Sequence, residues 1–128
     1  MVLLDTHALL WWTLDPGRLS PKASSACSKI LQTGSLISSI SIWEIGIKIK
    51  NGRIDIGMAI EDYTRKLNQL NCVEIVPVDE KIWMESIRLR WENRDPADRV
   101  IVATALFRSV PIVSKDEKIS SFYGKTLW

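Results

Sequence analysis

The sequence predicts an α/β fold in which helices cover a parallel sheet. Short apolar segments, each flanked by polar or turn residues, alternate along the 128-residue chain with longer segments of helical periodicity. The apolar fraction of 46% is enough for one core, so we expect a single domain over residues 1–128. No internal repeat or low-complexity tract argues for another organisation. The candidate strands are residues 2–4, 35–38, 73–76, 111–113 and 125–127.

Between the first three strands we expect helices. Ser20 and Pro21 form an N-cap and first-position pair that opens a helix over 22–32, and Gly34 ends it. Apolar residues at spacings of three and four predict a further helix over 58–70.

Residues 40–49 fit both an alternating and a helical pattern. We interpret them as a helix, because the strand just before them needs a crossover to reach a parallel neighbour. Asp79 caps a helix that runs to about residue 91, and Asp95-Pro96 opens another over 99–108.

Composition and charge exclude several classes of protein. The net charge of +2 lacks the excess of a protein that coats nucleic acid nonspecifically, so any such contact must be local. Asp5 interrupts the apolar start of the chain, and no segment approaches the ~20 apolar residues that span a membrane. Cys27 and Cys72 lack metal-ligand spacing and are expected to be reduced thiols of a cytoplasmic protein.

Two acidic residues follow predicted strands. Asp5 comes directly after residues 2–4, and Asp116 follows residues 111–113 after a gap of two. In open α/β sheets the ligand site lies beyond the carboxyl ends of the strands, where the strand order reverses. If these strands are neighbours at that point, the two carboxylates share one crevice. Alternatively, each residue only caps the helix that follows it.

A third acidic residue, Glu44, lies in the apolar run Ile42-Trp43-Glu44-Ile45. Charged side chains are rarely buried there without a partner or a metal. The alternative is a half-exposed glutamate that pairs with Lys48 four residues later.

The fourth acidic residue, Asp98, is followed three, four and seven residues later by Ile101, Val102 and Ala105. These apolar residues form a stripe on its face of the predicted helix, so Asp98 should point inward along the sheet. Alternatively, the negative charge of Asp98 only stabilises the first turn by its interaction with the helix dipole. Asp95 precedes the stripe and is the better cap, so we assign Asp98 as the ligand and Asp95 a supporting role.

Four such acids in one crevice would repel one another strongly. Two carboxylates about 6 Å apart at an effective dielectric near 20 repel by roughly 3 kcal/mol. A hard divalent cation such as Mg²⁺ or Mn²⁺ relieves this repulsion through oxygen ligands. Such a cation polarises a phosphoryl oxygen and lowers the pKa of a bound water, which is the chemistry of phosphodiester hydrolysis.

Four segments together resemble the successive motifs of PIN-domain proteins, the nearest group being the VapC-like toxins. The segments span almost the whole chain: Leu3-Leu4-Asp5-Thr6-His7-Ala8-Leu9-Leu10-Trp11, Ser41-Ile42-Trp43-Glu44-Ile45 with Lys48 and Gly52-Arg53, Asp95-Pro96-Ala97-Asp98-Arg99 with Ala103-Thr104-Ala105, and Val113-Ser114-Lys115-Asp116. Four motifs in this order are far more specific than any one of them.

This resemblance implies a three-layer α/β/α fold with strand order 3-2-1-4-5. It implies a Mg²⁺- or Mn²⁺-dependent endoribonuclease that forms a homodimer and is blocked by an antitoxin protein. The implied catalytic and metal-binding residues are Asp5, Glu44, Asp98 and Asp116. Thr6 and Ser114 are implied neighbours that hold water or phosphate. Relatives often carry His and Phe where this chain has Asn93 and Ala97, which puts substrate contacts in doubt more than metal binding.

Other tempting residues have simpler interpretations. His7, the only histidine, should face away from Asp5 on a helix and is expected to be structural. Trp11 and Trp12 are expected to pack in the core or in a dimer interface. Several basic residues flank the acids and could offset phosphate charge, although most would be solvated: Lys48, Lys50, Arg53, Arg94, Arg99 and Lys115.

Two other functions remain open from the sequence. In a phosphatase of the haloacid-dehalogenase type, Asp5 would be phosphorylated, but that motif needs a second Asp where His7 stands. Alternatively, the chain is a non-catalytic PIN-like module that binds RNA or a protein, with its acids acting as helix caps.

Overall fold

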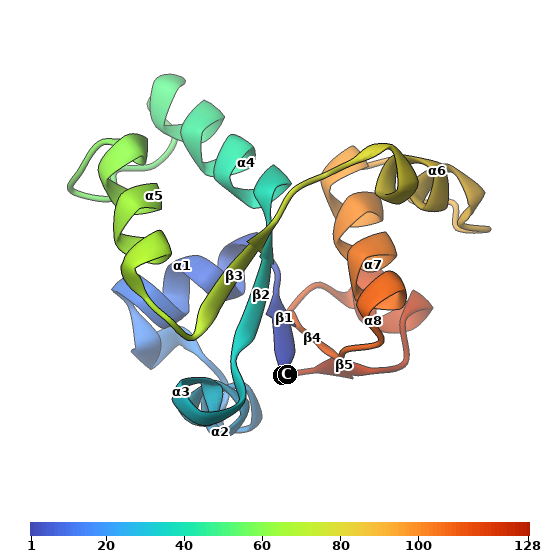
Figure 1. The fold of residues 1–128 in the computed structure, drawn as a ribbon, viewed down its shortest axis with the longest axis horizontal. Coiled ribbons are helices and arrows are strands. Elements are labelled where there is room, and N and C mark those ends of the chain that lie inside the picture. Colours follow the sequence, from blue (N-terminus) through green and yellow to red (C-terminus); the bar gives the residue numbers. More distant parts are fainter.

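The computed structural model describes all residues, Met1–Trp128, and contains a parallel sheet with helices on both faces (Figure 1). The strands are β1 (Val2–Leu4), β2 (Ser35–Ser38), β3 (Val73–Val76), β4 (Ile112–Val113) and β5 (Thr126–Leu127). Their order is β3-β2-β1-β4-β5, and every neighbouring pair is parallel. The α/β/α fold class and the strand order 3-2-1-4-5 are therefore confirmed.

The last two strands each begin one residue later than predicted. Pro111 has no N–H group for the ladder, so β4 starts at Ile112, although the carbonyl of Pro111 still accepts a hydrogen bond from the Leu3 N–H at 2.9 Å. Lys125 likewise contributes only its carbonyl, which accepts from the Ile112 N–H at 2.9 Å.

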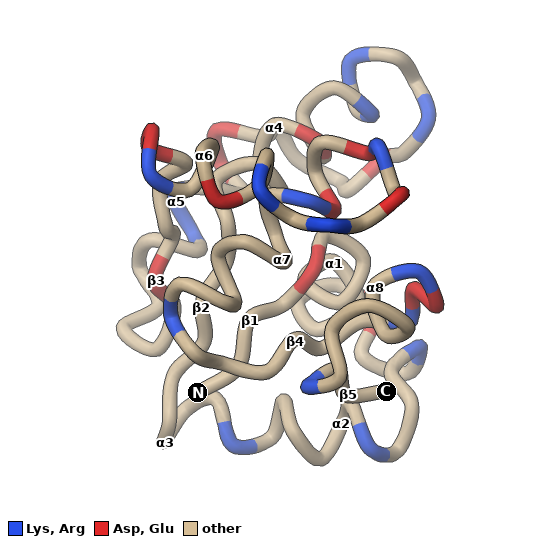
Figure 2. Tube along the Cα trace, turned by 90° about the vertical axis from the view of Figure 1, so that its right-hand side faces the viewer, with Lys and Arg blue, Asp and Glu red and all other residues tan.

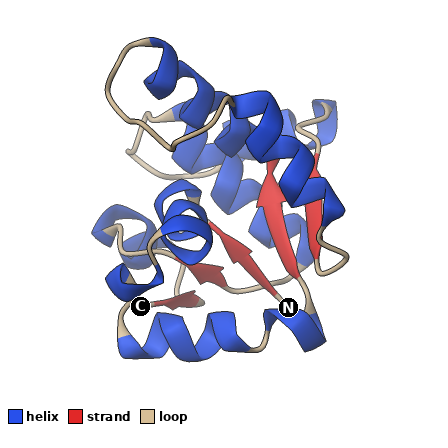
Figure 3. Ribbon diagram, turned by 90° about the vertical axis from the view of Figure 1, so that its left-hand side faces the viewer, coloured by secondary structure: helices blue, strands red, loops and turns tan.

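The chain forms eight α-helices and one 3₁₀ turn: α1 (Thr6–Leu14), η1 (Pro16–Arg18), α2 (Pro21–Ser28), α3 (Ile30–Thr33), α4 (Ser39–Lys50), α5 (Ile60–Gln69), α6 (Glu80–Arg88), α7 (Pro96–Arg108) and α8 (Glu117–Phe122). Figure 3 shows helices on both sides of the strands. The ambiguous segment 40–49 is helical, as expected. None of the helices is both long and apolar enough to pass through a lipid bilayer.

Alternating residues of the central strands build two apolar layers. Leu3 of β1 and Ile112 of β4 pack with α6, α7 and α8 on one face. Leu4 and Val113, one residue later on each strand, pack with α1, α2 and α5 on the other. All four side chains are fully buried. Strands buried on both faces read as continuous apolar runs, which is why the sequence shows the strands so plainly.

One predicted helix is wrong in its extent. Residues 22–32 form not one helix but two, which are separated by a turn at Lys29, whose N–H donates to the carbonyl of Ala26 at 3.3 Å. The break directs Ile30 into the core, where it is fully buried. Gly34 ends the second helix with a φ of +82°, which an L-residue rarely adopts.

The ends of three other predicted helices shift by one to three residues. α5 covers Ile60–Gln69 within the predicted 58–70. The helix capped by Asp79 ends at Arg88 rather than near residue 91. α7 begins at Pro96, directly after its cap.

Candidate active site

The site lies at the carboxyl edge of the sheet, where β1 and β4 end side by side. Leu4 pairs with Val113, so the next residues, Asp5 and Ser114, are also neighbours. α1 follows β1 on one face and α8 follows β4 on the other, which makes this the point where the strand order reverses. Figure 2 shows both acidic and basic positions in the chain around the starts of α7 and α8.

Asp5 is the buried centre of this edge, with 6% of its surface exposed. Its Oδ1 accepts a hydrogen bond from the Ala8 N–H at 2.8 Å and thereby caps α1. Its Oδ2 accepts a short hydrogen bond from the hydroxyl of Ser114. Asp5 is therefore a helix cap, as the simpler interpretation had it, and it also lies beside Ser114 at the carboxyl edge of the sheet.

Glu44 enters the site from the first turns of α4. Its Oε1 accepts a short hydrogen bond from the Thr6 hydroxyl, and Thr6 is also 2.9 Å from the hydroxyl of Ser41. The ion pair with Lys48 that offered an alternative is not formed, since the two salt bridges of the chain lie elsewhere. Thr6 thus positions a carboxylate, a role different from the water or phosphate contact that we expected.

Asp98 is half-buried in the first turn of α7. Its Oδ2 accepts a hydrogen bond from Nδ2 of Asn93 at 2.9 Å. Asp95 is the cap of the helix, since its Oδ1 accepts from the N–H groups of Ala97 and Asp98 at 2.9 and 3.3 Å. The division of roles between Asp95 as cap and Asp98 as inward acid holds in the structure.

Asp116 caps α8 by accepting a hydrogen bond from the Lys118 N–H at 2.8 Å. Its own N–H donates to the hydroxyl oxygen of Ser114 at 3.0 Å. Ser114 therefore connects the carboxylate of Asp5 to the backbone of Asp116, across the two strands at the reversal.

The acids around Asp5 and Asp98 lie close enough to affect the ionisation of these two residues. The pKa of Asp5 is raised to about 6, mainly by burial and to a smaller extent by the charges of Asp98 and Asp116, against the hydrogen bonds from Ser114 and Ala8, which lower it.

Burial is also the main reason that the pKa of Asp98 is raised to about 6. The Asn93 hydrogen bond lowers it, whereas the charges of Asp95, Asp116 and Glu44 raise it. The structure thus brings Asp98 and Asp116 near Asp5, and Glu44 and Asp116 near Asp98.

Carboxylate oxygens are suitable ligands for a hard cation, although the carboxylates of this site do not converge on a single position. No three acidic, histidine or cysteine side chains are arranged to hold a metal directly. Mg²⁺ commonly takes only one or two carboxylates directly and reaches the others through water. A cation would stabilise the ionised form of Asp5 most, because its carboxylate is buried, has a raised pKa and lies among other acids. The donor set therefore fits a magnesium or manganese ion.

The side chain of Arg99 has a structural role that the sequence did not indicate. Its guanidinium donates five hydrogen bonds of 2.7–3.1 Å to backbone carbonyls of Ser86, Leu89, Trp91 and Asn93. These five donors are occupied, so Arg99 has no guanidinium N–H left to bind a phosphate, and its suggested part in offsetting phosphate charge stays a prediction. Arg99 instead ties down the segment that carries Asn93.

His7 lies near two of the acids but makes no hydrogen bond to them. Its ring packs against Trp11, with centroids 5.6 Å apart, and its pKa is lowered mainly by partial burial, whereas the charges of Glu44 and Asp116 raise it. Trp11 also contacts Trp128 at 5.5 Å, and Trp12 packs against one of the cores.

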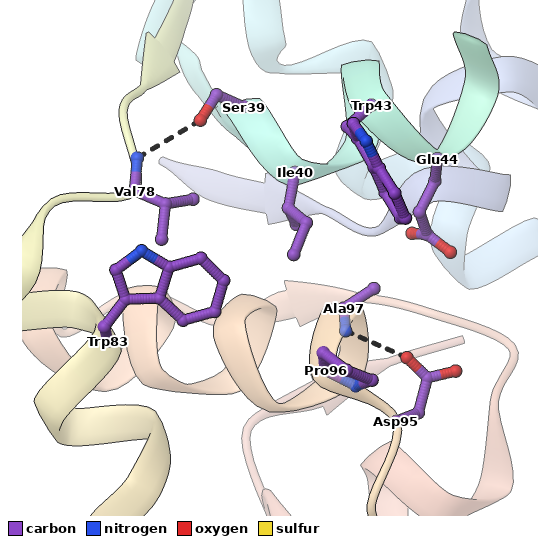
Figure 4. A pocket seen from close by; sticks show the side chains of 9 residues that line it. All are labelled: Ser39, Ile40, Trp43, Glu44, Val78, Trp83, Asp95, Pro96 and Ala97. Atoms are coloured by element: carbon purple, nitrogen blue, oxygen red, sulfur yellow. Dashed lines mark hydrogen bonds between the residues drawn. The ribbon is translucent and has the colours of Figure 1, made fainter. Parts of the chain in front are cut away.

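A groove of about 560 Å³ leads away from the acids toward α6 (Figure 4). Glu44 and Asp95 lie at one end of it and Trp83 lies at the other, with Trp43 beside Glu44. Its other walls are mostly apolar, and no Lys or Arg lines it.

Sequence reasoning missed two residues that shape the site. Ser41 contacts Thr6, and its only signal was its position in the resembling motif. Asn93 holds Asp98, and it was visible only as a departure from the family pattern.

Comparisons with known proteins agree with this geometry. A family model described as PIN domain matches residues 2–125. Ribonuclease VapC22 of Mycobacterium tuberculosis is 30% identical over 121 residues, which are 94% of this chain and 90% of that protein.

Solved structures share the fold at lower identity. VapBC2 from Rickettsia felis, bound to a DNA fragment from its promoter, matches with a TM-score of 0.67 and 16% identity over 100% of both chains. A toxin–antitoxin complex from Klebsiella pneumoniae matches with a TM-score of 0.65 and 22% identity, covering 98% of this chain and 95% of that one.

Proposed function

The chain belongs to the PIN-domain family, and on that premise we propose that it is a metal-dependent endoribonuclease, the toxin of a toxin–antitoxin pair, with residues 1–128 as one domain. One observation carries the proposal: Asp5, Glu44, Asp98 and Asp116 are far apart in the sequence, yet they gather into an acidic cluster near the switch point of the sheet, where the charges of Asp98 and Asp116 act on Asp5 and those of Glu44 and Asp116 act on Asp98. The similarity to a ribonuclease over most of the chain supports the choice of RNA as substrate.

We assign the four acids as ligands of Mg²⁺ or Mn²⁺. Such a cation would polarise a phosphoryl oxygen of RNA and lower the pKa of the water that attacks it. Asp5 is the best-held ligand, because Ser114 and the backbone of Ala8 fix both of its oxygens. Thr6 orients Glu44 in the same way.

Without a cation, the acidic site should repel an RNA strand. Four carboxylates repel phosphate as well as one another, and burial of Asp5 adds the cost of removing its charge from water. Loading with a divalent cation would offset about half of the charge of four ionised carboxylates, so binding of RNA and of metal should favour each other.

The relatives indicate partners for this chain. The solved relatives include toxin–antitoxin complexes, and one was solved with promoter DNA. We infer that this chain binds a cognate antitoxin protein that blocks the acidic site, and that it forms a homodimer. We place it in the cytoplasm, where its free Cys27 and Cys72 would stay reduced.

Cleavage of structured RNA by the purified protein tests the proposal. We expect cleavage with Mg²⁺ or Mn²⁺, none with EDTA, and a loss of at least about 100-fold for Asp5→Asn and Glu44→Gln, since each removes a proposed ligand. Glu61→Gln on α5 is the matched control, because Glu61 is exposed and distant from the cluster. Equal cleavage by Asp5→Asn and the parent would dismiss the metal site, and no cleavage by any protein would favour a non-catalytic binding module.

A further inference from the structure

A second pocket, which shares no lining residue with the apolar groove, adjoins the acidic cluster. It has a volume of about 650 Å³ and lies between α8 and the segment that joins α6 to α7. Its lining is almost entirely polar: Arg90, Trp91, Glu92, Asn93, Arg94, Lys118 and Ser121.

The pocket carries an uncompensated positive charge. Arg90, Arg94 and Lys118 contribute three cations, against the single carboxylate of Glu92. None of the three forms a salt bridge, because the two ion pairs of the chain involve Arg65 and Arg108. All three side chains are exposed and free to meet an anion.

The pocket is joined directly to two of the proposed metal ligands. Asn93, in its wall, donates a hydrogen bond to Oδ2 of Asp98 at 2.9 Å. The N–H of Lys118, in the opposite wall, donates to Oδ1 of Asp116 at 2.8 Å. An anionic group held in this pocket would therefore lie next to the acidic cluster, which would act on the adjacent group of the same ligand.

The walls of the pocket are already organised. The five hydrogen bonds of Arg99 hold the backbone around Leu89, Trp91 and Asn93 in one conformation. The Trp91 ring stacks on Phe122 with centroids 4.7 Å apart and an angle of 14° between the planes, which joins this segment to α8. A preorganised site loses less entropy when it binds its ligand.

We propose that this pocket binds a backbone phosphate of the RNA strand, beside the phosphate that the acidic cluster cleaves. The choice of RNA as the source of the phosphate rests on the proposed function. An acidic cluster repels a polyanion, so affinity for the strand must come from cations near it. The groove at Trp43 and Trp83 has no cation in its lining, whereas this pocket has three, so the RNA backbone leaves the site on this side.

Binding of RNA at different salt concentrations tests the proposal apart from cleavage. The variant Arg90→Gln/Arg94→Gln/Lys118→Gln and the parent are titrated by fluorescence anisotropy with a labelled single-stranded RNA in EDTA. Each phosphate contact that is lost reduces the slope of log K against log salt by about 0.7, so we expect a reduction of about 0.7 for the one phosphate held in the pocket. With Mg²⁺, the variant should show a KM at least tenfold higher with kcat changed less than twofold.

A variant with the same loss of charge elsewhere serves as control. Lys22, Lys29 and Lys66 are exposed, lie on or beside α2 and on α5, and form no salt bridge. Their triple change to Gln should retain the parent's slope and KM.

The possible results separate this inference from the proposed function. If the parent cleaves RNA but the pocket variant matches it in slope and KM, the pocket does not bind phosphate and the inference is wrong. If the parent binds RNA with the expected slope difference but never cleaves it, the inference stands and the nuclease proposal fails. Tighter binding of a polyglutamate peptide than of RNA of equal charge would also overturn the inference, since the pocket would then serve an acidic protein.

Discussion

The Ser114 hydroxyl donates a hydrogen bond to Oδ2 of Asp5, across two strands that are 109 residues apart in the sequence. The two strands are neighbours only because the order of the sheet reverses between them. This contact stabilises the charged form of a carboxylate that burial would otherwise keep protonated, and it lowers the pKa of Asp5.

Replacing Ser114 with Ala should make the site more sensitive to acid. A hydrogen bond to a charged group contributes about 1.5–3 kcal/mol, and its loss should move the acidic limb of the cleavage profile toward higher pH by about one pH unit. Cleavage rates between pH 5 and pH 9 measure this shift. Ser24→Ala on the exposed face of α2 should leave the profile unchanged. A profile of Ser114→Ala that coincides with the parent's would show that Asp5 does not limit activity.

Asp5→Asn should abolish cleavage yet stabilise the metal-free protein at pH 8. The pKa of Asp5 is about 6 in the folded protein, above its ordinary value of 3.8, so the folded state binds the proton more tightly. The contribution of Asp5 to the free energy of unfolding is therefore greatest below about pH 4 and falls as the pH rises through about 6. The loss for Asp5 is at most about 3 kcal/mol, at 1.36 kcal/mol per pKa unit.

Urea unfolding in EDTA at pH 8 and pH 4 measures this difference. The Asn side chain keeps an oxygen that can accept from the Ala8 N–H and has an N–H that can donate to Ser114. The substitution therefore removes the charge and leaves both hydrogen-bonded positions occupied. The advantage of Asp5→Asn over the parent should be largest at pH 8 and shrink at pH 4. A variant less stable than the parent at pH 8 would contradict the raised pKa.

Asn93→Ala should lower activity by about 10- to 100-fold, as is typical when the partner of a metal ligand is removed. The change releases Asp98, whose pKa the Asn93 hydrogen bond lowers, so Mg²⁺ affinity should fall most below pH 7. Asn93→His can restore a donor at this position and should recover activity that the Ala variant loses. Isothermal titration with Mg²⁺ at pH 6 and pH 8 provides the measurement, and unchanged affinity at both values would exclude a role for Asn93 in holding Asp98.

Arg99→Lys should destabilise the protein even though it keeps the charge. The guanidinium donates five hydrogen bonds to four carbonyls, and one ammonium group cannot replace that fork. We expect a loss of about 2–4 kcal/mol in urea unfolding. Hydrogen exchange should accelerate in residues 89–93, whereas Arg65→Lys, an exposed residue on α5, should change neither measurement.

Much of this protein could be predicted from local patterns along the chain. Strands buried on both faces read as apolar runs, and the caps Ser20, Asp79 and Asp95 each act on an N–H group two or three residues away. Placing Asp5 and Asp116 just beyond two strand ends therefore already located the candidate site. The assignment of metal ligands, by contrast, remains a prediction.

Only the tertiary structure decided how the site is held. The Ser114–Asp5 contact depends on the pairing of β1 with β4, and the Thr6–Glu44 contact on the packing of α1 against α4. Arg99 looked like a surface cation until the fold placed four carbonyls around it. Periodicity and capping act over a few residues, so they specify elements and their ends. Contacts between distant segments depend on strand register and helix packing, which settle only when the whole core forms.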